Sequence, residues 1–147
     1  MIHRFNVTDD IYNKLMKYSK DKSSKNNHKL AGNIRNEFNL NKYSNEIQPF
    51  ILKQLYQIKP LMDYFKDLKV LHPKGLPLCL SELWVNHQKK YEFNPFHNHA
   101  GVFSFIIFLK IPYTNEEQAL ISPGKKSNND KAGKLCFYYL DQNVDGG

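Results

Sequence analysis

The sequence predicts an α+β domain in which helices come first along the chain and strands follow. Before the segment His72–Pro77, apolar residues recur at the three- and four-residue spacing of amphipathic helices. From Leu78 onward, apolar runs of strand length alternate with segments rich in proline, glycine and polar residues. The length of 147 residues suits one domain with its own core. We therefore expect a single domain, mainly helical over 1–71 and mainly β over 78–147.

Two helices are predicted in the first part. The first follows Thr8, a residue that favours the N-cap position, and has acidic residues in its first turn. The second starts near Ser44 and tolerates Pro49, which we place in its first turn. Because proline lacks a backbone donor, this helix should kink or restart at Pro60, and its apolar face continues to Leu68. These helices are expected to cover one face of a sheet.

The most apolar of the predicted strands is Val102–Ile111, VFSFIIFLKI. Its odd-numbered side chains should share one face and its even-numbered ones the other, and both faces should be buried. A polar segment, Thr114–Lys134, follows, and we interpret it as a lid, a binding loop or disordered chain. The other predicted strands are Ile2–Val7, Leu78–Phe93 and Leu135–Leu140.

Composition excludes several classes of protein. Hydrophobic residues make up 41% of the chain and aromatic residues 14%, which is typical of a globular protein and not of a disordered one. The longest apolar run, Val102–Leu109, is too short to cross a bilayer, and the N-terminal residues lack the pattern of a signal peptide. Cys79 and Cys136 have neither the spacing of a zinc site nor that of a disulfide framework. We expect no membrane partner and a cytoplasmic location.

The formal net charge of +7 bears on the choice of partner. The lysines are scattered, and no predicted helix carries a continuous basic stripe. No signature of an RNA-recognition motif or of a helix-turn-helix is present. The charge is therefore interpreted mainly as a lysine-rich, solvated surface, with nucleic acid as a weakly supported partner.

The strongest candidate for a functional site is a pair of histidines in the segment Tyr91–Tyr113. On a strand, side chains alternate between faces, so His97 and His99 should point the same way while Asn98 points the other way. Two imidazoles placed like this can bind one metal ion. Imidazole suits iron, zinc, copper and nickel, so the spacing alone does not select the metal. The alternative interpretation is two surface histidines at a strand end. We prefer the metal-site interpretation because the pair lies next to an apolar run that is typical of a core strand.

One stretch of the chain resembles a known family. Residues 84–112, WVNHQKKYEFNPFHNHAGVFSFIIFLKIP, are similar to the Fe(II)/2-oxoglutarate-dependent oxygenases of the prolyl-hydroxylase-like type, especially members found in phages and marine bacteria. Residues 29–34, KLAGNI, are also similar to a segment of that group. The resemblance is strongest over about a third of the chain. The residues that carry it are Trp84-Val85-Asn86, Asn94-Pro95, His97, His99, Gly101 and Ser104-Phe105.

The resemblance implies a double-stranded β-helix, or jelly roll, that holds Fe(II) and takes 2-oxoglutarate as cosubstrate. His97 matches the first metal ligand of the family, and His99 occupies the second position, where an Asp or Glu is usual. The family's third ligand is a distant histidine, and a basic residue binds the 2-oxoglutarate carboxylate. Both are expected beyond Tyr139, but no histidine follows His99. We therefore expect a partial jelly roll, C-terminally incomplete and inactive on its own.

Other side chains could complete such a site. Glu92, Asp141 or Asp145 could supply the missing carboxylate, although the spacing selects none of them. His87 could reach the pair from the preceding strand, but a lone strand histidine is more often one whose hydrogen bonds are satisfied or one that is exposed. The histidines in terminal or loop contexts, to which we assign no role, are His3, His28 and His72.

Three functions are compatible with these residues. The first is a dioxygenase that hydroxylates a C–H bond of a protein, a nucleic acid or a small molecule; if it is phage-encoded, it would act in the host-cell cytoplasm. The second is a cupin-like metal-binding protein, against which stands the absence of a Glu a few residues after His99. The third is a non-catalytic jelly-roll interaction module. Affinity for 2-oxoglutarate separates the first from the others, and salt-dependent binding to nucleic acid would favour the third.

Overall fold

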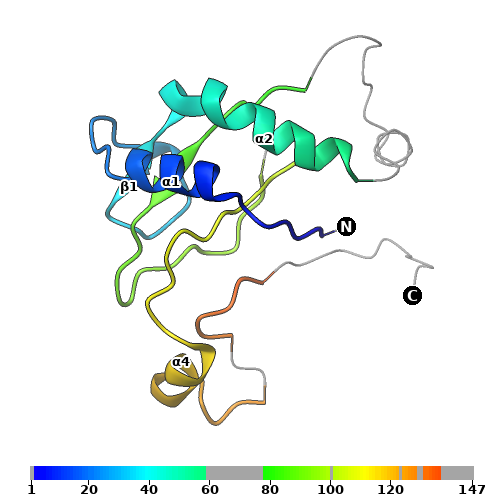
Figure 1. The fold of residues 1–147 in the computed structure, drawn as a ribbon. Coiled ribbons are helices and arrows are strands. Elements are labelled where there is room, and N and C mark those ends of the chain that lie inside the picture. The colour runs from blue at the N-terminus through cyan, green and yellow to red at the C-terminus, as the bar shows by residue number, and fades with distance from the viewer. Residues whose placement is uncertain (1, 59–77, 100, 123, 129–130, 137–147) are drawn as a thin grey trace, which may run out of the picture. The chain divides into compact units, whose positions relative to one another are not determined.

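The computed structural model describes residues 2–58, 78–99, 101–122, 124–128 and 131–136. Contacts divide the chain into two units, Met1–Leu109 and Lys110–Gly147. Figure 1 shows the helices and strands of the two units as a ribbon. The first unit contains α1 (Asp9–Tyr18), η1 (Asn27–Lys29), β1 (Glu37–Asn39), η2 (Asn41–Tyr43), α2 (Ser44–Tyr56) and β2 (Trp84–Asn86), and the second contains α4 (Asn115–Ile121).

Helix α1 confirms the first predicted helix. Thr8 is its N-cap, in an extended conformation, and two aspartates occupy its first turn, where carboxylates interact favourably with the helix dipole. The apolar spacing of the sequence becomes one buried face. The buried residues of that face are Ile11, Leu15 and Tyr18.

Helix α2 confirms the predicted start at Ser44 and corrects the position of Pro49. Pro49 is the sixth residue of the helix, so it lies in the second turn and not in the first. A proline there donates no hydrogen bond to the carbonyl four residues earlier, and the helix nevertheless continues to Tyr56 with Pro49 exposed. The predicted continuation to Leu68 lies outside the described residues.

The two strands pair in an antiparallel sheet. Phe38 lies opposite Val85, and Glu37 lies opposite Asn86. Because side chains alternate along a strand, Phe38 and Val85 share one face of the sheet while Glu37 and Asn86 share the other. Strand β2 falls within the predicted strand Leu78–Phe93 but is only three residues long.

The predicted opening strand, Ile2–Val7, is wrong. These residues form no strand, and Ile2 and Phe5 are 52% and 41% exposed. The sheet takes its first strand from Glu37–Asn39 instead, a segment whose polar residues give little strand signal.

The core of the first unit lies where α1 and α2 meet the strand pair, as Figure 1 shows. Leu83, just before β2, enters this core and is 6% exposed. Its backbone is fixed by two hydrogen bonds: Leu40 N donates to Leu83 O at 2.8 Å, and Leu83 N donates to Asn41 Oδ1 at 2.7 Å. The buried cluster consists of Ile11, Leu15, Tyr18, Leu40, Ile47 and Leu83.

The apolar run Val102–Leu109 packs through one face only. Ile107 and Leu109 are partly buried against the core, whereas Phe105, which was predicted to share their face, is 37% exposed. The prediction that both faces are buried is wrong, because the even-numbered face remains in contact with solvent and the run forms no strand. The exposed fractions on that face include 39% for Val102, 52% for Ile106 and 61% for Phe108.

The second unit contains a helix that the sequence interpretation missed. Thr114 and Glu117 form a capping box at the start of α4: the Thr114 hydroxyl accepts from Glu117 N at 3.2 Å, and Glu117 Oε2 accepts from Thr114 N at 2.7 Å. The segment Thr114–Lys134 is therefore not a loop throughout. Residues 135 and 136 of the last predicted strand form no strand, and the rest of it lies outside the described residues.

The α+β class is confirmed. The described part of the chain contains one sheet of two strands, whereas a jelly roll has eight, so the jelly roll stays a prediction. None of the described helices is long and apolar enough to span a membrane.

Candidate metal centre

The histidine pair lies in the segment that follows β2. The rings of His97 and His99 are neighbours: their centroids lie 4.7 Å apart and their planes are inclined by 54°. Both side chains are exposed. The expectation that the pair lies on a strand is wrong, because residues 94–99 form no strand. The rings nevertheless lie side by side on one stretch of chain.

The position of the proton on His97 follows from its hydrogen bond. Nδ1 of His97 lies 2.7 Å from the carbonyl oxygen of Pro95. A carbonyl can only accept, so Nδ1 carries the proton in this contact and the lone pair is left on Nε2. Histidines that bind metals commonly donate their second ring N–H to a backbone carbonyl in this way. The Asn94-Pro95 dipeptide therefore sets the tautomer that a metal ligand needs.

Glu92, a candidate for the missing carboxylate, is engaged elsewhere. Its Oε2 accepts from Lys89 N at 2.8 Å and its Oε1 accepts from Arg35 N at 3.2 Å. The hydrogen bond from the Lys89 backbone is the main reason that the pKa of Glu92 is lowered. Glu92 thus closes the turn after β2 and holds Arg35 to it.

His87 also has a structural contact. Its Nε2 lies 2.7 Å from Ser19 O, just past the end of α1, and its ring meets the Phe38 ring edge-on at 6.0 Å. His87 is half-buried on the sheet face that carries Phe38. This contact ties β2 to α1 and gives the ring a hydrogen-bond partner outside the histidine pair.

A third ligand is not found within the part of the chain that the structure describes. There, no group of three or more His, Cys, Asp or Glu side chains could hold a metal ion. Asp141 and Asp145 lie outside the described residues. Within the described residues, the pair could supply at most two ligands of a metal site.

Comparison with known proteins assigns no relative to the chain. No family model, curated protein or solved structure matches it. Function must therefore be inferred from the residues and their contacts.

A buried glutamate near the histidine segment was missed at the sequence level. Glu37 of β1 is 0% exposed. Burial raises the pKa of Glu37, and the negative charge of Glu92 adds to the effect. Glutamate is seldom fully buried, and nothing in the local pattern EFN indicates that this one is.

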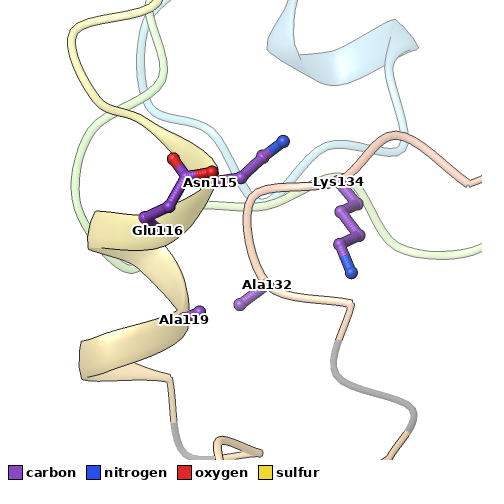
Figure 2. A pocket seen from close by; sticks show the side chains of 5 residues that line it. All are labelled: Asn115, Glu116, Ala119, Ala132 and Lys134. Atoms are coloured by element: carbon purple, nitrogen blue, oxygen red, sulfur yellow. The ribbon is translucent and has the colours of Figure 1, made fainter.

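The second unit has an open cavity of about 240 Å³ beside α4, shown in Figure 2. The two alanines face each other across it, while the glutamate and the lysine lie on opposite sides. Nothing in this lining forms a nucleophile with its base or a set of metal ligands, so we assign the cavity no chemistry. Its lining consists of Asn115, Glu116, Ala119, Ala132 and Lys134.

Proposed function

We propose that this chain belongs to a non-haem Fe(II)/2-oxoglutarate-dependent dioxygenase with a jelly-roll body, and that it supplies the first two metal ligands. One observation carries the proposal: the His97 and His99 rings lie 4.7 Å apart, and the Pro95 carbonyl leaves Nε2 of His97 for a ligand bond. Imidazole nitrogen is a suitable ligand for iron, so the donors fit the metal that the resemblance implies.

His97 and His99 would hold the iron as two of its ligands. When bound, the iron together with 2-oxoglutarate and oxygen supplies the oxidation of a C–H bond. The residues of this chain contribute orientation: the Pro95 carbonyl keeps the proton on Nδ1 of His97 and fixes the direction of Nε2. Since both histidines are exposed, the pair can be reached from solvent.

The histidine at position 99 sets an expectation for affinity. A carboxylate in this place would bring a negative charge to the divalent cation, whereas a neutral imidazole does not. With two described ligands and no such charge, the 147-residue chain should bind metal weakly and show no turnover of 2-oxoglutarate.

A second function is favoured by the exposed apolar face of Val102–Leu109. Val102, Ile106 and Phe108 present apolar side chains to solvent. Grouped exposed apolar residues are typical of surfaces that bind another protein. A non-catalytic interaction module is therefore the alternative.

The deciding experiment is an anaerobic titration of the chain with iron(II) and 2-oxoglutarate, followed by the visible charge-transfer band. We expect weak iron binding that is lost in His97→Ala and His99→Ala. The matched control is His28→Ala, which removes an exposed histidine of η1 and should leave the titration unchanged.

The outcomes separate the functions. Iron binding that develops the band with 2-oxoglutarate supports the dioxygenase, whereas metal binding that 2-oxoglutarate does not alter indicates a cupin-like protein. Absence of binding at millimolar iron would overturn the metal site and leave the interaction module. Succinate release by the chain alone would contradict the expected lack of turnover.

A further inference from the structure

Glu37 is buried with only part of its carboxyl group satisfied. Asn27 Nδ2 donates to Glu37 Oε2 at 3.2 Å. Within the described residues, Oε1 has no hydrogen-bond partner and is closed off from solvent. A buried acceptor without a donor lowers the stability of the folded state, so a partner for this oxygen is expected.

Gly32 lies next to that oxygen and next to the side-chain oxygen of Asn94. A Cβ built on Gly32 would lie 2.6 Å from Glu37 Oε1 and 2.6 Å from Asn94 Oδ1. These distances are shorter than real Cβ atoms tolerate, so any side chain at position 32 would push one of the two groups away. The backbone of Gly32 is not in the left-handed region, so the need for glycine here is a need for space.

The neighbouring backbone holds this contact in place. Asn33 N donates to Phe93 O at 2.8 Å, and Asn33 and Phe93 form an isolated antiparallel bridge. Gly32 precedes Asn33 and Asn94 follows Phe93, so the antiparallel register of the bridge places these two residues opposite each other. Asn26 N donates to Glu37 O at 2.9 Å, which holds β1 against the same region.

The same contact leads directly to the histidine pair. Asn94 precedes Pro95, whose carbonyl accepts from His97 Nδ1 at 2.7 Å. A shift of Asn94 would move that carbonyl and with it the ring of His97. Glu37 can therefore act on His97 through two residues without touching it.

We propose that Glu37, Gly32 and Asn94 form a joint around the buried carboxyl of Glu37 that positions the segment 94–99, with Glu37 as a neutral donor toward Asn94 Oδ1. In the joint, a protonated carboxyl donates from the Glu37 oxygen that has no partner, toward Asn94 Oδ1, the other oxygen that a Cβ at position 32 would meet. Burial favours the neutral form of such a group. Glu37 is a positioning residue, and its effect on metal binding rests on the proposed function.

Three variants test the joint. Glu37→Ala removes the donor, Glu37→Gln keeps a neutral donor of the same shape, and Gly32→Ala inserts a methyl group between the two oxygens. The matched control is Gly101→Ala, close to the pair on its other side, where the new Cβ would meet Phe103 O at an ordinary contact distance of 3.4 Å.

The first measurement is amide hydrogen exchange in the metal-free protein, so it does not depend on the proposed function. We expect the Asn33 amide, which donates to Phe93 O, to exchange about fivefold faster in Glu37→Ala and Gly32→Ala. Glu37→Gln and Gly101→Ala should match the wild type. The Ser19 amide, bonded to Leu15 O at the end of α1, should be unchanged in every variant and so reports on global folding.

The second measurement is cobalt(II) affinity, with the metal's visible spectrum as the readout. Glu37→Ala and Gly32→Ala should weaken cobalt binding about tenfold, because loss of a residue that orients a metal ligand commonly lowers affinity by this amount. Glu37→Gln should leave the affinity unchanged. If the wild type binds no cobalt, the proposed function fails and hydrogen exchange alone decides the joint. Unchanged exchange at Asn33 in Glu37→Ala, faster exchange at Ser19 to the same extent, or a Glu37→Gln variant that behaves like Glu37→Ala would each overturn the joint.

Discussion

Tyr18 and Tyr43 stack face to face, with ring centroids 3.9 Å apart and planes inclined by only 3°. Each hydroxyl then donates to a carboxylate on another segment: Tyr18 to Glu46 Oε2 at 2.5 Å, and Tyr43 to Asp21 Oδ2 at 2.8 Å. The stack joins α1 to η2, and the two hydrogen bonds extend it to α2 and to the loop after α1. These ionisable groups give the first unit a pH dependence that can be measured.

Tyr18 should titrate late in an alkaline titration followed by tyrosinate absorbance. The hydrogen bond to Glu46 raises the pKa of Tyr18 to about 12. The pKa is higher in the folded state, so this stabilisation is complete below pH 10 and is lost as the pH rises through 12. Glu46→Gln should lower the Tyr18 midpoint toward 10, whereas Glu82→Gln, a change on an exposed loop, should not. An unchanged midpoint in Glu46→Gln would contradict the assignment.

Asp21 should contribute stability at neutral pH and lose it in acid. Lys42, with Ser23 and Tyr43, holds the pKa of Asp21 well below its usual range. The folded-state pKa is depressed, so the contribution is present above about pH 3.8 and is lost as the pH falls below that value. In thermal melts, Asp21→Asn should lower the melting temperature at pH 7, and its difference from the wild type should shrink in acid. Lys14→Gln, which breaks the exposed pair with Asp10 and leaves the first-turn aspartates in place, should have almost no effect at either pH.

The one-sided packing of the apolar run can be tested with a pair of isoleucines. Ile47 of α2 is 0% exposed, and truncation to alanine should cost about 2–5 kcal/mol of unfolding free energy in urea titrations. Ile106 is 52% exposed, and the same truncation should change the free energy by no more than about 0.5 kcal/mol. A large loss in Ile106→Ala would show that its face is buried in solution.

The capping box of α4 should control the protection of that helix. Thr114→Ala removes the acceptor for Glu117 N and should destabilise the helix by about 0.5–2 kcal/mol. The measurement is hydrogen exchange of the Gln118 amide, which donates to Thr114 O. Thr114→Ser retains a hydroxyl and should exchange as the wild type does. Equal exchange rates in the alanine and serine variants would mean that the box does not support α4.

The helices of the first unit could be predicted because local residues determine them. The spacing of Ile11, Leu15 and Tyr18 and the cap at Thr8 are visible in the sequence, and α1 follows them. Strand β1 could not be predicted in this way, since it is defined by pairing with residues far along the chain. The burial of both faces of Val102–Leu109 was wrong because apolar sequence shows only that a face can be buried, not that another element covers it. The capping box Thr-Asn-Glu-Glu at 114–117 was readable and was overlooked.

In the candidate site, too, some features could be predicted from the local sequence and others could not. The two-residue spacing of His97 and His99 indicates neighbouring rings, which is how the structure places them. Neither the Pro95 carbonyl that fixes the tautomer nor the buried carboxyl of Glu37 could be inferred from spacing. The contact between His97 and Pro95 is local but depends on the backbone conformation, whereas the surroundings of Glu37 depend on the chain returning to Asn33 and Gly32, contacts between segments that periodicity does not encode.

The place of Leu83 in the core has a consequence for how the chain folds while it is being synthesised. Leu83 fills the space between α1 and α2, yet the ribosome makes it 42 positions after Asn41, whose side chain anchors it. Leu83 follows the end of α2 at Tyr56 by 27 residues. At about 5–20 residues per second, the nascent chain therefore spends roughly 1–5 s with both helices made and their shared core unfilled. During that interval the apolar faces of the helices are open to chaperones and to other nascent chains. Ribosome-bound chains arrested soon after Tyr56 should therefore be cut readily by protease, and resistance should appear only once Leu83 has left the exit tunnel.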